Sequence, residues 1–275
     1  MEMTSFFDVN VNFLDYFKIR INPGFIFYRP KVNFQIETSK YNLRVATSFS
    51  ELIEVFRFRQ EVFFGKSESI EYDVDSFDSA ADHIIVCDAN TNKICGTYRI
   101  TSSENTSKHY SQQEFNLDTF ISRPGIKLEL GRAAIHPEHR NGHVLDLLWR
   151  GIGKYAIETN ARYLFGCSSV MTTSPDITNE IFHYLKNNSM ISTDYEVSTT
   201  PKYTFGFYKE KVAPHKIEQA KEIIPPLLRS YINAGAKICG APAIDRDFGC
   251  IDFMTILDLD EISQTYRKRY FGKTQ

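Results

Sequence analysis

The sequence has almost no net charge, no long hydrophobic run and no closely spaced pair of cysteines, and each of these absences excludes a class of protein. A formal net charge of −2 over 275 residues provides no global attraction to nucleic acid. No apolar run has the length of a membrane-spanning helix, and the N-terminal residues lack the basic start and apolar core of a signal peptide. We therefore expect a cytoplasmic protein that has no nucleic acid partner.

The cysteines are five in number, which is an odd count, and none of them forms a C-x-x-C motif. Free buried thiols are the expected state of such a set. Cys167 is a possible nucleophile, but a reactive thiol needs a nearby base or an electropositive site, and the sequence offers no such partner. We therefore interpret Cys167 as a small core residue, and Trp149, the only tryptophan, as a core residue too.

A content of 42% hydrophobic and 24% charged residues is that of an ordinary globular protein. Alternation and helical spacing of apolar residues, with capping and turn residues between them, predict a mixture of strands and helices. Residues 1–40, 101–118 and 190–220 give no clear pattern beyond one possible helical turn. The predicted strands are 43–47, 83–88, 93–100, 126–136, 163–170, 237–239 and 250–257, and the predicted helices are 48–64, 144–160, 174–185, 225–235 and 260–271.

Arg59 lies within the apolar stripe of the helix predicted from residue 48 to 64. A guanidinium group keeps its charge, so an inward-facing arginine needs carboxylate partners. Asp73, Asp75 and Asp78 follow in the sequence, and Arg99 ends the next predicted hairpin. These residues predict a polar cluster in which arginines and aspartates share a site.

The stretch from Lys127 to Trp149 reads as a strand, a polar loop and a helix, an order that can hold a ligand on backbone N–H groups. Glu129 and Arg132 would face opposite sides of a regular strand. Gly131 between them favours a β-bulge that turns both side chains to one side. The competing interpretation, with one side chain on each face, stays open on spacing alone.

His136, His139 and His143 have a spacing that suggests a metal site. Pro137 and Gly142 place them on a loop, and no acid or cysteine close in sequence completes a ligand set. We therefore expect no bound metal. His83 and Asp88 would face opposite sides of a short strand, which excludes them as a catalytic pair.

Several separated motifs give the chain a family resemblance over residues 43 to 260. Arg59-x-x-Val-Phe63, Asp73-x-Asp-x-x-Asp78, Gly96-Thr-Tyr-Arg99 and Glu129-x-x-Arg132 resemble the acyl-homoserine lactone synthase branch of the GNAT acyltransferases. Leu128-Glu-Leu-Gly-Arg132, Leu147-Leu-Trp-Arg-Gly151, Phe165-Gly-Cys167, Pro225-Pro-Leu-Leu and Asp245-x-x-Phe-Gly more closely resemble the ornithine–acyl-[acyl carrier protein] N-acyltransferases of bacterial ornithine-lipid synthesis.

The resemblance implies an α/β (α+β) GNAT fold, in which helices flank a central, mixed and twisted sheet that splays between strands 4 and 5. On this basis residues 1–42 are an N-terminal covering segment, residues 43–200 are the acyltransferase core and residues 201–275 are the C-terminal part of the same fold. Acetyl-CoA users of this family bind the CoA pyrophosphate on a glycine-rich loop. Here the loop reads Arg140-Asn-Gly-His-Val144, with glycine one position early, which favours an acyl carrier protein as donor.

The implied reaction is acylation of the α-amine of an amino acid, expected to be ornithine, by a long-chain 3-hydroxyacyl group carried on the phosphopantetheine of acyl carrier protein. No permanently bound cofactor is expected. The resemblance and the residue types suggest three sets of site residues. The expected catalytic residues are Glu129 as the base, Arg132, Arg59, Asp75 and Asp78; the expected substrate-binding residues are Phe63, Asp73, Arg99, Trp149, Cys167 and Ser168; and the expected donor-binding residues are Ala133, Ala134, His139, Arg140, Asn141 and Gly142.

Other functions stay open at this point. The acceptor could be glycine, lysine or tyrosine, or the chain could be a homoserine-lactone synthase that uses S-adenosylmethionine. A CoA-dependent acetyltransferase and a non-catalytic binding module are further alternatives. Because the product would be a lipid precursor, transient contact with the inner membrane through the aromatic N-terminal segment or the basic tail is a hypothesis.

Overall fold

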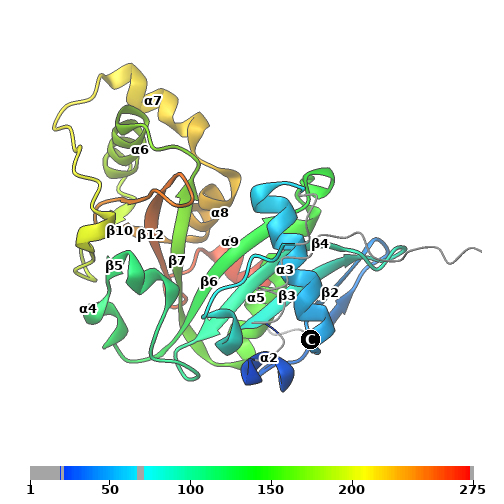
Figure 1. Cartoon of the computed structure of the whole chain (residues 1–275). Coiled ribbons are helices and arrows are strands. Elements are labelled where there is room, and N and C mark those ends of the chain that lie inside the picture. The colour runs from blue at the N-terminus through cyan, green and yellow to red at the C-terminus, as the bar shows by residue number, and fades with distance from the viewer. Residues whose placement is uncertain (1–18, 20–21, 67–70, 273–275) are drawn as a thin grey trace, which may run out of the picture. The chain divides into compact units, whose positions relative to one another are not determined.

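A computed structural model of the chain describes residues 19, 22–66 and 71–272. Two compact units are present, and each of them combines two parts of the chain (Figure 1). The first contains the described residues up to Thr101 together with Gly131–Tyr155, and the second contains Ser102–Leu130 together with the described residues from Ala156 onward. The boundaries of these two units differ from those of the expected segments 1–42, 43–200 and 201–275. Most of residues 1–21 of the expected covering segment lies outside the described residues.

The first unit contains an antiparallel sheet in which each strand pairs with the next along the chain. The strands are β1 (Gln35–Glu37), β2 (Tyr41–Val45), β3 (Asp82–Asp88) and β4 (Ile94–Ser102). The helices are α2 (Pro23–Ile26), α3 (Phe49–Phe64) and the short 3-10 helix η1 (Asp78–Ala80). Figure 1 shows α3 lying along these strands, and its buried Leu52, Val55 and Phe56 pack against Ile85 and Cys87 of β3.

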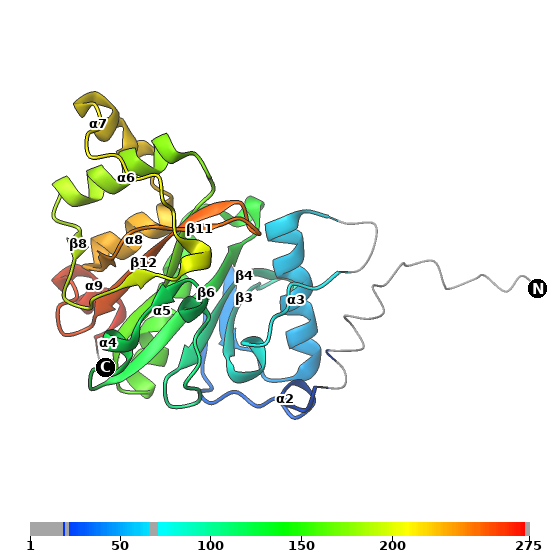
Figure 2. The same ribbon diagram turned by 60° about the vertical axis from the view of Figure 1, so that its left-hand side comes forward.

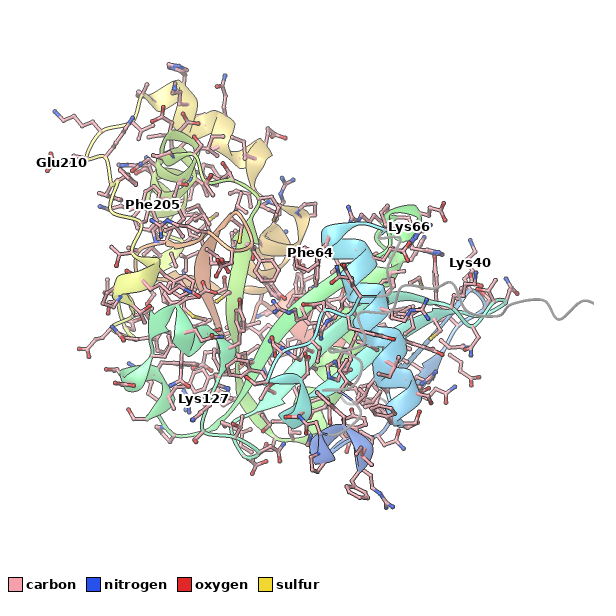
Figure 3. The ribbon with its side chains drawn as sticks, viewed as in Figure 1. Lys40, Phe64, Lys66, Lys127, Phe205 and Glu210 are labelled. Carbon is pink, nitrogen blue, oxygen red and sulfur yellow. The ribbon has the colours of Figure 1, made fainter. Side chains whose placement is uncertain are left out.

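Helix α3 begins where the sequence predicts it. The Ser48 hydroxyl accepts a hydrogen bond from the Glu51 N–H, and the Glu51 carboxylate accepts one from the Thr47 N–H. These two contacts satisfy backbone donors that have no partner inside the helix. The helix ends at Gly65, and Figure 3 shows Phe64 and Lys66 at this end.

Strand β6 (Ile126–Ile135) and helix α5 (His143–Glu158) each contribute residues to both units. Between them lies the 3-10 helix η3 (Pro137–His139). Arg132 has φ +51, so the irregular backbone expected beside Gly131 occurs one residue later, at the arginine itself. A non-glycine residue in this left-handed region is uncommon, and it redirects the strand locally.

The second unit contains a mixed sheet with helices α6, α7 and α8 packed on one face. Strands β6 and β7 are parallel, β7 and β12 are antiparallel, β12 and β10 are antiparallel, and β10 and β8 are parallel. Strand β11 also pairs with β12, and β5 with β9. The elements are η2 (Tyr110–Gln113), β5 (Phe115–Asn116), α4 (Asp118–Ile121), β7 (Ala161–Val170), α6 (Pro175–Asn187), β8 (Ile191–Ser192), β9 (Ser198–Thr199), η4 (Pro201–Tyr203), α7 (Pro214–Ile223), α8 (Pro226–Ala234), β10 (Lys237–Cys239), β11 (Ala243–Asp245), β12 (Cys250–Asp258) and α9 (Gln264–Tyr270).

The two faces of this sheet bury different apolar groups. On one face, Val170, Ile251 and Phe253 pack with residues of α6, α7 and α8; Figure 2 shows α6 and α7 side by side. On the other face, Phe165 and Met254 pack with apolar residues of the 115–121 and 195–203 segments. This second face also bears the polar groups described below.

Strands β6 and β7 approach each other closely at Gly166. Their pairing runs from Ile126 opposite Ala161 to Glu129 opposite Phe165 and ends there. A Cβ atom on Gly166 would lie 2.2 Å from the carbonyl oxygen of Leu130, so only glycine fits. The expected splay beyond this point concerns residues of two different units, and it stays a prediction.

The elements that the sequence predicts are present with small shifts at their ends, and the sheet is mixed with flanking helices as expected. The three unassigned regions contain short elements instead: α2 and β1 in the first, η2, β5 and the start of α4 in the second, and β8, β9, η4 and α7 in the third. No helix within the described residues combines the length and the apolar character that crossing a membrane would require.

Candidate active site

Arg59 is completely buried at the centre of an ionic network in the first unit. Its Nε donates to Asp73 Oδ2 at 2.7 Å, and its Nη1 and Nη2 donate to the two carboxylate oxygens of Asp78 at 2.7 and 2.9 Å. The Asp73 carbonyl oxygen accepts a further bond at 2.5 Å. The predicted pairing of the inward arginine with the downstream aspartates is therefore confirmed.

Two more arginines join this network through the same acids. Arg99 Nη1 donates to Asp75 at 2.7 Å and to Asp78 at 3.2 Å. Arg132 Nη2 donates to Asp75 at 3.0 Å, and its Nε lies 3.3 Å from Asp73 Oδ2. We call Arg59, Arg99, Arg132, Asp73, Asp75 and Asp78 the Arg–Asp network. Three guanidinium groups face three carboxylates, so every acid in it already has a cationic partner.

The charges of this network hold its buried acid in the ionised form. Burial alone favours the neutral acid, but the charges of Arg59 and Arg99 hold the pKa of Asp78 well below its usual range. His83 is also buried here, with Nε2 3.8 Å from Asp78 Oδ1. Burial lowers the pKa of His83 to about 4, so its ring stays neutral at physiological pH.

The loop that the sequence marked for donor binding is held by its own side chains. Arg140 Nε donates to the Ile135 carbonyl at 3.0 Å, and the Asn141 amide oxygen accepts from the His143 N–H at 3.1 Å. His139 contacts the Tyr41 hydroxyl through Nδ1 at 3.1 Å. Gly142 has φ +84, and a Cβ atom added there would meet nothing within 4 Å, so backbone conformation rather than space requires glycine.

The remaining residues expected at the site lie in different surroundings. Trp149 is buried on α5, Ala134 is buried and Ala133 half-buried on β6. Phe63 is half-buried near the end of α3, where its ring meets that of Phe64 edge-on at 6.4 Å. Their roles in binding stay predictions.

Glu129 lies in the second unit, where its carboxylate is almost completely buried. Its Oε1 accepts from the Ser111 N–H and from the Ser111 hydroxyl, both at 2.7 Å, and its Oε2 accepts from the Tyr110 N–H at 2.9 Å. His109 Nδ1 lies 3.7 Å from Oε2. Burial raises the pKa of Glu129, but the contact with His109 and the hydrogen bonds from Ser111 outweigh it, so the pKa lies below its ordinary value.

His109 is a residue that the sequence analysis missed. Its side chain is 2% exposed, its ring meets Phe165 edge-on at 5.1 Å, and its Nε2 has no hydrogen-bond partner within the described residues. The only sequence signal is a histidine two residues before a serine in a polar segment, which is too weak to single it out. Its position depends on Glu129, which lies far along the chain and anchors η2.

Alternation along β7 and its pairing place several side chains on the face that bears Glu129. Glu129 stands opposite Phe165, so both side chains lie on one face, and Cys167 and Ser169 follow on that face at steps of two. Ser168 lies on the other face, where its hydroxyl accepts from Thr255 at 2.8 Å. Of the two neighbours expected to bind substrate, Cys167 therefore shares the face of Glu129 and Ser168 does not.

Cys167 has the properties of a neutral thiol. Burial and the nearby carboxyl groups of Glu114 and Asp252 raise its pKa well above the usual value. A thiol that resists ionisation is a poor nucleophile. The structure thus agrees with the interpretation of Cys167 as a residue that does not form a covalent intermediate.

The histidines with metal-like spacing form an aromatic contact in the loop. The rings of His136 and His139 meet edge-on with centroids 5.9 Å apart. Within the described residues, the group whose ligand atoms all come within 4.8 Å of one another is a different one, Asp245, Cys250 and Asp252.

Comparison with known proteins identifies relatives in sequence. The family model of the acetyltransferase (GNAT) domain matches residues 54–150. An L-ornithine N(alpha)-acyltransferase of Brucella abortus is 30% identical over 248 residues, which cover 83% of this chain and 88% of that protein. One of Rhizobium meliloti is also 30% identical, over 212 residues that cover 72% of this chain and 70% of that protein.

Solved structures also show similarity to the chain. FeeM, an N-acyl amino acid synthase from uncultured soil microbes, is similar with a TM-score of 0.46 and 12% identity, covering 86% of this chain and 96% of that one. TofI, determined in a complex with an inhibitor and MTA, is similar with a TM-score of 0.43 and 16% identity, covering 82% of this chain and 90% of that one.

Proposed function

This chain belongs to the family of GNAT N-acyltransferases that includes the L-ornithine N(alpha)-acyltransferases, and we propose that it acylates the α-amine of ornithine. The acyl group is a long-chain 3-hydroxyacyl group delivered as a thioester of acyl carrier protein. The observation that carries the proposal is the identity of 30% over 83% of the chain with a protein of that activity. The buried Glu129 with its neighbour His109 supplies groups suited to the chemistry.

The reaction requires that an ammonium lose its proton before it can attack. The amine nitrogen then forms a bond to the thioester carbonyl carbon, and the C–S bond breaks. The thiolate of the phosphopantetheine arm leaves and takes up a proton, so that amide and free thiol are the products. The protein must accept the first proton and stabilise the negative charge that develops on the carbonyl oxygen.

We assign the proton transfer to Glu129 and His109 acting together. A carboxylate with a lowered pKa is a weak base by itself. A neutral imidazole can accept a proton at a ring nitrogen that carries none. His109 Nε2, which has no partner within the described residues, takes the proton, and the Glu129 carboxylate at 3.7 Å from Nδ1 stabilises the resulting imidazolium. The bonds from Tyr110 and Ser111 hold that carboxylate in place.

The oxyanion is assigned to backbone N–H groups of β6. Backbone N–H groups at Gly131 to Ala134 can donate to a developing negative charge. The Arg–Asp network fixes this part of β6 through the side chain of Arg132. Its role in the proposal is to position the strand.

Acyl carrier protein is the donor that the loop favours. In the loop from Arg140 to Val144 the His143 N–H is already bonded to Asn141, and the Arg140 guanidinium is bonded to a carbonyl. Two groups that could bind the pyrophosphate of CoA, the His143 N–H and Arg140 Nε, are thus engaged within the protein. A phosphopantetheine arm has no such requirement, because it lacks the adenosine diphosphate of CoA.

Single-turnover acylation tests the proposed proton transfer. Glu129→Gln and His109→Gln should each lower the rate at pH 7 by about 10²- to 10⁴-fold. Part of the loss should be recovered at alkaline pH, where more of the amine is free of its proton. Glu218→Gln and His215→Gln, which change exposed residues of α7, are the matched controls and should leave the rate unchanged.

One result would count against the assignment of proton transfer to Glu129 and His109. Near-normal rates of Glu129→Gln at both pH values would remove Glu129 from the chemistry.

A panel of ornithine, glycine, lysine and tyrosine tests the acceptor in the same assay. Preference for glycine or tyrosine would replace ornithine as the acceptor and leave the acyltransferase activity in place.

A further inference from the structure

Three carboxyl groups lie buried together in the second unit, separate from the Arg–Asp network. Glu114, Asp245 and Asp252 are 1%, 3% and 3% exposed. We call them the buried acid cluster. Within the described residues none of them forms an ion pair with a basic side chain, in contrast to every acid of the Arg–Asp network.

Two members of the cluster are partly satisfied by hydrogen bonds. Asp245 Oδ1 accepts from the N–H groups of Asp247 and Phe248 at 2.8 and 3.0 Å. Asp252 Oδ1 accepts from the Ser169 hydroxyl at 2.6 Å, and its Oδ2 from the Cys250 thiol at 3.4 Å. These bonds fix the two aspartate side chains.

Glu114 is different, because neither of its carboxylate oxygens accepts a hydrogen bond within the described residues. Burial, and the nearby charges of Asp252 and Asp245, raise the pKa of Glu114 to about 9. Burying an unpartnered carboxyl group beside two others costs several kcal/mol, so folding alone gives no reason to keep it there. A cationic ligand would supply the donors that Glu114 lacks.

The cluster adjoins the Glu129–His109 pair on the same face of the sheet. Asp252 stands opposite Ser169, two residues beyond Cys167 and four beyond Phe165, the residue that faces Glu129. At about 3.3 Å per residue, the step from Phe165 to Ser169 is roughly 13 Å, and Cys167 stands midway along it. The Cys167 thiol experiences the charges of Glu114, Asp252 and Glu129 together, so it lies between the two groups.

We propose that the buried acid cluster binds the side-chain ammonium of the acceptor amino acid while its α-amine lies at the Glu129–His109 pair. This inference rests on the proposed function and names the residues that select the acceptor. An ammonium offers three N–H donors, enough to reach Glu114 and Asp252 at once. The cluster also keeps this second amine protonated and therefore unreactive, which restricts acylation to the α-nitrogen.

A metal ion is the competing occupant, because ligand atoms of Asp245, Cys250 and Asp252 come within 4.8 Å of one another. The Cys250 thiol donates a hydrogen bond to Asp252 Oδ2 at 3.4 Å, so two of these ligand atoms already contact each other. Glu114, the unpartnered carboxyl group, is outside that set. The geometry therefore favours the ammonium.

The test compares ornithine with norvaline, which has the same carbon chain without the side-chain amine, using one acyl donor. The wild-type protein should prefer ornithine by at least about 100-fold in kcat/KM, because a site built to bind a polar group rejects the analogue that lacks it. Glu114→Gln and Asp252→Asn should each lower kcat/KM for ornithine by at least about tenfold, mainly through KM. They should change kcat/KM for norvaline by less than about twofold. The control Glu218→Gln should change kcat/KM for neither substrate.

The possible results distinguish a failure of this inference from a failure of the proposed function. Ornithine preference that survives both substitutions overturns the acid cluster as the ammonium site and leaves the proposed function intact. Acylation of neutral amino acids in preference to ornithine by the wild-type protein overturns both. Stoichiometric zinc or another metal in the purified wild-type protein, lost in Asp252→Asn, would assign the cluster to a metal instead. Thermal unfolding of each variant establishes that it is folded.

Discussion

Arg59 and Asp78 are fully buried ions that meet through two hydrogen bonds. Removing the Asp78 charge leaves the buried Arg59 guanidinium with Asp73 as its remaining carboxylate, which is far more costly than losing an exposed pair. Asp78→Asn should therefore lower the free energy of unfolding by about 3–5 kcal/mol in urea denaturation. Glu61→Gln, which breaks the exposed pair with Lys66, is the control and should change it by less than about 0.5 kcal/mol. Equal effects would mean that Asp78 contributes no more than a surface ion.

Glu114 makes a prediction for the pH dependence of stability. The folded protein keeps a proton on Glu114 up to pH about 9, whereas the unfolded chain releases it near the ordinary value of 4.5. The folded state binds the extra proton in this window, so the free energy of unfolding falls as pH rises, by up to about 1.4 kcal/mol per pH unit. Glu114→Gln should therefore gain stability relative to the wild-type protein as the pH rises, with the difference largest at pH 8 and shrinking toward pH 5.

Chemical denaturation at several pH values measures this difference. Parallel stability curves for the two proteins would show that Glu114 ionises normally. That result would also remove the main physical reason for a cationic ligand at the buried acid cluster.

Single residues differ in how far the sequence reveals them. Arg59 could be predicted because a charged residue interrupts an apolar stripe of helical spacing, and acids that could pair with it follow closely in the chain. His109 and Glu114 could not, because they lie in a polar segment without periodicity. Their environment comes from Glu129 and Asp252, which reach them only once the sheet has formed.

At the level of secondary structure, the contact of β6 with β7 depends on one glycine. Gly166→Ala would place a Cβ atom 2.2 Å from the Leu130 carbonyl oxygen, where backbone must move to accommodate it. We expect a loss of about 2 kcal/mol or more in unfolding free energy, as for other overpacked sites. Gly131→Ala, whose Cβ would meet only the Arg99 guanidinium at 3.7 Å, is the matched control and should cost less. A smaller loss for Gly166→Ala than for Gly131→Ala in thermal denaturation would contradict this account.

Sequence patterns predict the longer secondary-structure elements well. Helices with a cap residue and a regular apolar stripe, such as α3 and α6, begin at the predicted serines. Strands of four or more residues were also predicted within a few positions. The short strands β8 and β9 were missed because two residues carry no periodicity, and their pairing with distant strands creates them.

At the scale of the whole molecule, the proposed function rests on a family relationship and on two polar sites in the second unit. The first unit contains an ionic network. The sequence motifs were sufficient to suggest the family, and the comparisons confirm it. The sequence analysis expects Asp73 to bind substrate and Asp75 and Asp78 to be catalytic. The structure shows each of these acids paired with arginine, whereas the carboxyl group without an ion-pair or hydrogen-bond partner within the described residues is that of Glu114.

The central claim is that the chain acylates the α-amine of ornithine from acyl carrier protein. The most direct measurement is mass spectrometry with fragmentation of the product formed from 3-hydroxyacyl carrier protein and ornithine, with the matching CoA thioester as the control donor. The account predicts Nα-(3-hydroxyacyl)ornithine, formed at least about 100-fold more efficiently from the carrier protein than from CoA. Acylation at the side-chain nitrogen, or no amide product from the carrier protein, would contradict it.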